Sequence, residues 1–205
     1  MKKYLSILAV AAVAACATSA FAQGTVVFNN GTGLVNKWTD NANSTLVGVP
    51  KGGGFVQLFW APTGTAYTPW TTSLSGAQFY AANPGWVLST PPTGFTTPGA
   101  GKFSGGTFTL QPLGAGGTID YVVVGWTGSA ANFDAAITGG GMVGVSSKFT
   151  SGTGNPTSVP AGTATALSGT FGGMTLAPVT QVPEPTTLAL AGLGAAALVI
   201  FRRRK

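Results

Sequence analysis

The sequence contains no histidine and a single cysteine, Cys16, among its 205 residues. The absence of histidine excludes Ser-His-Asp and Cys-His catalytic arrangements and removes the side chain on which most zinc sites depend. Cys16 lies in an N-terminal segment with the features of a signal peptide, so no disulfide is expected in the mature domain. We therefore predict no cofactor, no metal site and a fold held together by a hydrophobic core.

Acidic residues are also scarce, since the chain has only Asp40, Asp120, Asp134 and Glu184. A glycoside hydrolase needs two carboxyl groups that face one bond. The three aspartates leave an aspartate-dependent hydrolase open as an alternative, but no motif supports any pair of them. Asp40 lies in the Asn-rich stretch 36–43, which lacks the spacing of a calcium loop. We therefore predict that the protein is not an enzyme.

Charged residues make up only 7% of the chain, yet its net charge is +6. The basic residues gather at the two ends, in Lys2-Lys3 and at 202–205. The segment between them has four lysines against three aspartates. A nucleic-acid-binding protein instead places a basic patch on its folded face. Nucleic acid is therefore not expected as a partner.

Residues 1–22 have the three parts of a signal peptide. These parts are the basic pair Lys2-Lys3, an uncharged and mostly apolar run at 4–17, and the small-x-small site Ala20-Phe21-Ala22. We predict export across the inner membrane, with cleavage by signal peptidase after Ala22. Residues 13–16 also resemble a lipobox, which leaves lipidation of Cys16 as an alternative.

Residues 23–181 are predicted to form a single all-β domain. Short runs of β-prone residues recur between turns rich in Gly, Pro, Asn, Ser and Thr. These runs lie at 25–28, 55–60, 86–88, 107–110, 119–126, 145–149 and 167–176. We expect an antiparallel β-sandwich or a jelly roll.

Five segments of this domain allow more specific structural predictions. Threonine alternates with apolar residues at 107–110, which predicts one buried face, whereas 121–126 is apolar on both faces, as in a central strand covered on two sides. Residues 130–137 favour a helical turn, and 150–165 are expected to form a long loop. Residues 139–144 match G-x-G-x-x-G but lack the preceding strand and following helix of a dinucleotide site. We interpret them as a glycine turn.

Aromatic residues are the one feature that points to a ligand. Exposed planar rings are suited to stacking on sugar faces, much as amphipathic aromatics serve other recognition surfaces. The candidates are Trp38, Trp60, Trp70 and Trp86. These residues suggest a polysaccharide-binding module as an alternative function. The competing interpretation is core packing, because a sandwich without disulfides needs large apolar side chains.

Residues 182–205 combine a proline hinge, an apolar run and a basic cluster. Pro183 and Pro185 disfavour both helix and strand, so an accessible hinge is expected. Residues 188–201 are uncharged and, as a helix, would reach about 21 Å, short of a hydrocarbon core of about 30 Å. A membrane stop on the cytoplasmic side is predicted at Arg202, Arg203, Arg204 and Lys205.

This arrangement resembles the PEP-CTERM sorting signal of exported proteins in Gram-negative bacteria, with Pro183, Glu184 and Pro185 as its motif. The resemblance implies processing near the motif by an exosortase-type enzyme at the inner membrane. Many such proteins are associated with exopolysaccharide or biofilm production. We therefore predict a structural or adhesive protein of the cell surface or extracellular matrix, with exopolysaccharide as a candidate partner. An ordinary C-terminal transmembrane anchor that is never cut is the alternative.

Overall fold

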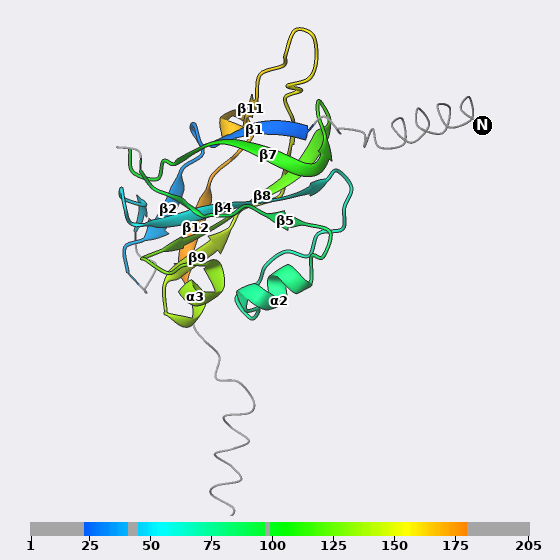
Figure 1. Cartoon of the computed structure of the whole chain (residues 1–205). Coiled ribbons are helices and arrows are strands. Elements are labelled where there is room, and N and C mark those ends of the chain that lie inside the picture. Colours follow the sequence, from blue (N-terminus) through cyan, green and yellow to red (C-terminus); the bar gives the residue numbers. More distant parts are fainter. Residues whose placement is uncertain (1–22, 41–44, 97–98, 180–205) are drawn as a thin grey trace, which may run out of the picture.

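The computed structural model describes residues 23–40, 45–96 and 99–179 (Figure 1). The elements are β1 Gln23–Asn29, β2 Val35–Trp38, β3 Leu46–Gly48, β4 Gly54–Pro62, α2 Gly76–Ala81, β5 Val87–Leu88, β6 Thr93–Gly94, β7 Ser104–Gly114, β8 Thr118–Thr127, α3 Phe133–Thr138, β9 Met142–Val145, β10 Phe149–Gly152, β11 Thr165–Ala166, the 3-10 helix η1 Leu167–Gly169 and β12 Met174–Pro178. In this part of the chain the fold is mostly β-sheet, as the sequence predicts.

The strands form two sheets that pack on one another. The larger, nine-stranded sheet has the order β3-β2-β12-β9-β8-β4-β5, with β10 also pairing with β8 and β6 with β4. The smaller sheet has the order β11-β1-β7. Most pairs are antiparallel, as expected for a sandwich, but β1 pairs with β11 and β2 pairs with β12 in parallel. Both parallel pairs join strands far apart in the sequence, which a parallel pair requires because its connection must cross over.

The domain has three layers, with the larger sheet in the middle (Figure 1). On one face, Tyr121 and Val123 of β8 join Val26 and Leu110 of the smaller sheet in the first hydrophobic cluster. On the other face, Val122 and its alternate neighbours pack under α2 and α3 in the second hydrophobic cluster. The prediction of a central strand covered on both sides is therefore confirmed. Burial of each large apolar side chain in these clusters stabilises the fold by roughly 1.5–3 kcal/mol.

The alternation at 107–110 is also confirmed in β7. Leu110 is fully buried and Phe108 packs against the first hydrophobic cluster, whereas Thr107 and Thr109 are exposed. This strand pairs with β1, whose residues alternate between buried and half-buried in the same way. The two strands thus present one apolar face to the larger sheet.

The run at 145–149 was expected to be one strand, and this expectation is wrong. Strand β9 ends at Val145 and β10 begins at Phe149, and both pair with β8 at different levels. Ser146 marks the break, because its backbone N–H donates to Val123 O at 2.8 Å while its Oγ accepts from the Val123 N–H at 2.9 Å. The register of the chain with β8 therefore shifts by one residue between β9, where Val145 is opposite Val124, and β10, where Phe149 is opposite Tyr121.

The run at 167–176 was also expected to be a strand, but β12 begins only at Met174. Residues 167–169 form η1, and Gly173 then adopts a φ of 94°, a conformation that favours glycine. A Cβ at Gly173 would lie 2.7 Å from Leu34 O, so glycine is also required by the close approach of the backbone just before β2. The predicted loop at 150–165 likewise begins as strand, because β10 extends to Gly152.

Local signals explain the two α-helices. The predicted helical turn at 130–137 is observed as α3, which begins after its cap Asn132. Helix α2 was missed, although Ser75 and Gln78 form a capping box in which each side chain bonds the other residue's backbone N–H. The predicted glycine turn at 139–144 is a turn only over residues 139–141, where Gly140 has a φ of 72°, because residues 142–144 belong to β9. A helix before the glycines and a strand after them is the reverse of a dinucleotide site.

Within the described residues, no helix has the length and apolar character needed to span a bilayer. The predicted signal peptide at 1–22, with Cys16, and the predicted sorting segment at 182–205 lie outside these residues.

Candidate functional site

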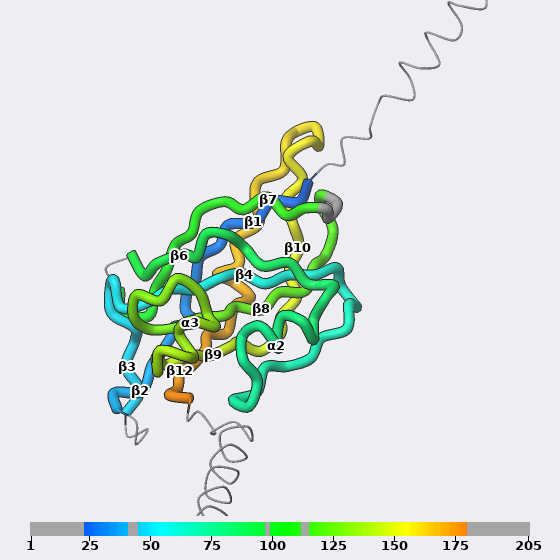
Figure 2. The backbone as a smooth tube through the Cα atoms, turned by 60° about the horizontal axis from the view of Figure 1, so that its bottom comes forward, coloured from blue at the N-terminus to red at the C-terminus, as the bar shows by residue number. Residues whose placement is uncertain are grey.

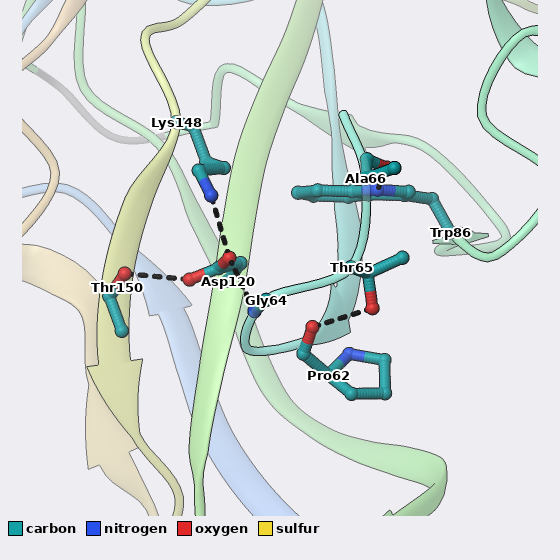
Figure 3. Close-up of polar contacts among 8 residues, drawn as sticks. All are labelled: Pro62, Gly64, Thr65, Ala66, Trp86, Asp120, Lys148 and Thr150. Carbon is teal, nitrogen blue, oxygen red and sulfur yellow. Dashed lines mark hydrogen bonds and ion pairs between the residues drawn. The ribbon is translucent and has the colours of Figure 1, made fainter. Parts of the chain in front are cut away.

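Asp120 in β8 is the most buried charged residue of the described chain, with 1% of its surface exposed. Its Oδ2 accepts a hydrogen bond of 2.8 Å from Lys148 Nζ, and its Oδ1 accepts one of 2.7 Å from Thr150 Oγ1 (Figure 3). The Gly64 backbone N–H donates a longer bond of 3.4 Å. Asp120 thus connects β8 to the start of β10 and to the turn after β4.

The surroundings of Asp120 keep it ionised. Burial acts to raise its pKa, but the hydrogen bonds from Lys148, Thr150 and Gly64 and the charge of Lys148 together hold the pKa below its usual value. Sequence reasoning missed this ion pair, because no motif links Lys148 to an aspartate 28 residues earlier. The carboxylate is engaged in the fold on both oxygens.

Asp134 in α3 binds the start of the other helix. Its Oδ1 accepts hydrogen bonds from the backbone N–H groups of Gly76 at 2.8 Å and Ala77 at 3.4 Å. These are orphan donors in the first turn of α2, so Asp134 caps that helix from outside. Burial and, to a lesser degree, the charge of Asp134 raise the pKa of Tyr80. Asp134 therefore ties the two helices of the outer layer together.

Asp40 follows β2 and is exposed. Asp120 thus lies in β8, Asp134 in α3 and Asp40 after β2, and the first two make contacts that hold the fold together. Among residues 23–40, 45–96 and 99–179, no group of three or more His, Cys, Asp or Glu is placed to hold a metal ion. Nothing in these contacts supports a hydrolase that uses a pair of aspartates.

Two of the four candidate stacking residues are core residues, in agreement with the competing interpretation of core packing. Trp60 is 5% exposed and packs in the first hydrophobic cluster. Trp86 is 7% exposed, lies 4.9 Å from the Tyr67 ring and 5.2 Å from the Phe59 ring, and donates from Nε1 to Ala66 O at 2.9 Å (Figure 3). A two-sided sheet core needs large side chains on both faces, so these rings are not available to a sugar.

Trp70 is half-buried at the edge of the second hydrophobic cluster. Its ring meets that of Phe133 edge to face, with 5.4 Å between the centroids, and its Nε1 donates to Leu74 O at 3.1 Å. The ring contact holds the segment before α2 against α3, and the hydrogen bond lies within that segment. Trp70 therefore has a structural role, with part of its ring left accessible.

Trp38 is the candidate that lies on an open face. It ends β2, where it stands opposite Leu46 of β3, and it is half-buried. Val35, Met174 and Leu176 of β2 and β12 point into the first hydrophobic cluster, so the alternate residues occupy the other face. There a shallow groove of about 440 Å³ is lined by Thr32, Leu34, Asn36, Gly172, Gly173, Met174 and Thr175. The groove lining is uncharged and rich in hydroxyl and amide groups.

The comparison with protein families gives one match, the PEP-CTERM protein-sorting motif, at residues 181–205. No curated protein and no solved structure matches the chain. The matched segment contains Pro183, Glu184, Pro185 and the basic cluster that the sequence analysis singled out. The chain therefore carries a PEP-CTERM protein-sorting motif, which implies export, sorting to the cell envelope and processing by an exosortase.

Proposed function

We propose that the chain is an exported structural or adhesive protein of the cell surface or extracellular matrix, delivered there by its sorting motif. The observation that carries this proposal is the PEP-CTERM match at 181–205. Signal peptidase, an exosortase-type enzyme and the inner membrane are its partners during export. The mature domain then acts through its surface.

The contacts of the domain are consistent with such a role. Asp120 and Asp134 are engaged in fold contacts rather than left in a cleft. The large aromatic side chains fill two clusters on either side of the central sheet. A sheet core of this kind suits a module whose task is to persist outside the cell without disulfides, because burial of apolar side chains is the main source of its stability.

Intact-mass measurement of the protein in cell fractions tests the proposal. We expect a mature product in the envelope or medium that starts at Gln23 and lacks the basic cluster. In the variant Glu184→Ala, the mass should include the tail and the protein should stay with the inner membrane. Pro178→Ala, outside the motif, is the matched control and should be processed normally. A full-length product dissolved in the cytosol would contradict the proposal.

Polysaccharide binding is a second candidate function, and the open face with Trp38 favours it. The half-buried indole lies on the same face of the sheet as Asn36 and Thr175, which line the groove and offer polar groups next to a stacking surface. Trp38→Ala should abolish retention on the host's exopolysaccharide, whereas Trp38→Phe should keep most of it. Unchanged retention of Trp38→Ala would remove this candidate.

A further inference from the structure

The last strand leaves the domain at the end of the sheet where β2 ends and β3 begins. Strand β12 runs parallel to β2, with Leu176 opposite Lys37, so Pro178 lies at the same end as Trp38. Strand β3 runs antiparallel to β2 and starts there with Leu46. Figure 2 shows β2, β3 and the end of β12 together on one side of the molecule. We call Trp38, Leu46 and Val47 the exit corner.

The exit corner exposes apolar side chains. Leu46 is 44% exposed and Val47 is 38% exposed, and only Val87 and Val159 join them as exposed large hydrophobic residues in the described part of the chain. Trp38 and Leu46 are directly opposite in an antiparallel pair, so their side chains lie next to each other on one face. Val47 lies on the other face, opposite Lys37. The edge strand is therefore apolar on both faces.

The surface beside the exit corner is nearly uncharged. Met142 of β9 stands opposite Pro178, which brings the turn before β9 to the same end of the sheet. A groove of about 380 Å³ in this turn and along α3 is lined by Gly, Ala, Ser and Thr residues alone. In β2, β3 and the described residues that follow β2, the charged residues are Lys37, which lies opposite Val47, and Asp40. Little charge would have to be desolvated if this end met a lipid surface.

Only a short segment links the described domain to the apolar run, so a bilayer that holds this run is close to the exit corner. Residues 180–187 separate the described domain from the apolar run at 188–201, and eight residues span at most about 30 Å even when fully extended. A bilayer that holds the apolar run is thus never far from the exit corner. Such tethering makes a weak contact effective, because the second contact becomes intramolecular.

We propose that the exit corner docks on the outer lipid surface of the inner membrane while the tail is anchored there. Trp38 lies at the headgroup level, as interfacial tryptophans do, and Leu46 and Val47 enter the boundary with the acyl chains. The docking rests on the proposed membrane step of the sorting motif. It fixes the orientation of the domain and keeps the Pro-Glu-Pro hinge next to the membrane, where a membrane-bound processing enzyme acts. Release of the tail removes the tether, and the weak contact alone is marginal.

The experiment uses the full chain reconstituted into vesicles of phosphatidylethanolamine and phosphatidylglycerol. In a Cys16→Ser background, single cysteines replace Leu46, Val159 or Ala196 and carry an environment-sensitive fluorophore. Val159 is fully exposed and belongs to the loop between β10 and β11, which lies at the end of the domain away from β2 and β3 (Figures 1 and 2), so it is the matched control. Nitroxide lipids in the vesicles quench labels that contact the membrane. We expect quenching at Leu46→Cys at least about twofold above that at Val159→Cys, together with quenching at Ala196→Cys.

The outcomes separate docking from anchoring. Quenching at Ala196→Cys with a solvent-like label at Leu46→Cys overturns the docking and leaves the anchor intact. An unquenched label at Ala196→Cys overturns the membrane step of the proposed function and the docking with it. Shielding of the Leu46→Cys label by the host's exopolysaccharide instead of lipid assigns the surface to glycan and overturns the docking. Val47→Cys provides a second labelling site should Leu46→Cys fold poorly.

Discussion

The Lys148 ammonium lies 2.8 Å from Asp120 Oδ2 and joins β8 to the segment that connects β9 and β10. The two partners differ in exposure, since the Lys148 side chain is 40% exposed and that of Asp120 is 2% exposed. The pair is thus anchored by a buried carboxylate, and loss of Lys148 leaves that carboxylate with fewer partners in a site where burial disfavours the charge.

The stability of the domain should fall as pH drops below about 4. The folded state holds the Asp120 pKa below its usual value, so the unfolded chain binds the proton more readily. The contribution of Asp120 to the free energy of unfolding is complete above its unfolded pKa of about 3.9. It is lost as the pH falls through the folded pKa of Asp120. Urea unfolding between pH 3 and pH 7 measures this dependence. Asp120→Asn should flatten the curve, and a wild-type stability that does not change over this range would refute the assignment.

Lys148→Met should destabilise the domain at pH 7 and move its acid transition to higher pH. The variant keeps most of the length of the side chain but removes a donor and a positive charge, so burial then raises the Asp120 pKa with less opposition. We expect a loss of about 1–3 kcal/mol in the free energy of unfolding. Lys51→Met removes an exposed lysine and serves as the control, with an expected change within about 0.5 kcal/mol.

Asp134→Ala should destabilise the domain through α2 rather than through α3. The change leaves the Gly76 N–H without its acceptor, and loss of a helix cap costs about 0.5–2 kcal/mol. Asp134→Asn retains an acceptor oxygen and should recover part of the loss. Amide hydrogen exchange should show faster exchange at Gly76 and Ala77 in the alanine variant. Slow exchange there, with stability unchanged, would rule out the capping role.

Gly173→Ala should be markedly more harmful than Gly172→Ala. A Cβ at Gly173 would meet Leu34 O at 2.7 Å, and its φ of 94° is unfavourable for alanine, whereas a Cβ at Gly172 meets nothing within 4 Å. We expect a loss of more than about 1 kcal/mol for Gly173→Ala and a near-neutral or slightly stabilising effect for Gly172→Ala. Thermal unfolding of the two variants side by side tests this. Equal midpoints would show that β12 does not start as described.

Trp60→Ala should lower the free energy of unfolding by about 3–5 kcal/mol, as expected for a large cavity in a packed core. Trp38→Ala should cost much less, because the ring is half-buried at the end of an edge hairpin. Chemical denaturation monitored by circular dichroism separates the two. A small effect of Trp60→Ala would mean that the ring is accessible after all and would restore it as a stacking candidate.

The amino-acid pattern alone predicted the class of fold and the strongest strands. Tyr121, Val122, Val123 and Val124 have no polar face, and a strand without a polar face must be covered on both sides. The sorting motif is equally local, because Pro183, Glu184 and Pro185 are recognised as a short stretch with the apolar and basic residues that follow. Both signals are complete within a few neighbouring residues, so no knowledge of distant contacts is needed.

Tertiary structure decided which aromatic residues remain accessible and what the aspartates do. Trp60 and Trp38 both lie in strands, yet Trp60 packs between the two sheets in the first hydrophobic cluster, whereas Trp38 is half-buried at the end of β2, beside the edge strand β3. The contact between Lys148 and Asp120 joins residues 28 apart in the sequence, and that between Asp134 and Gly76 joins residues 58 apart. Both form only when the chain has folded. The exit corner arises in the same way, since β12 must pair with β2 before residue 179 and Leu46 come to lie at one end of the domain.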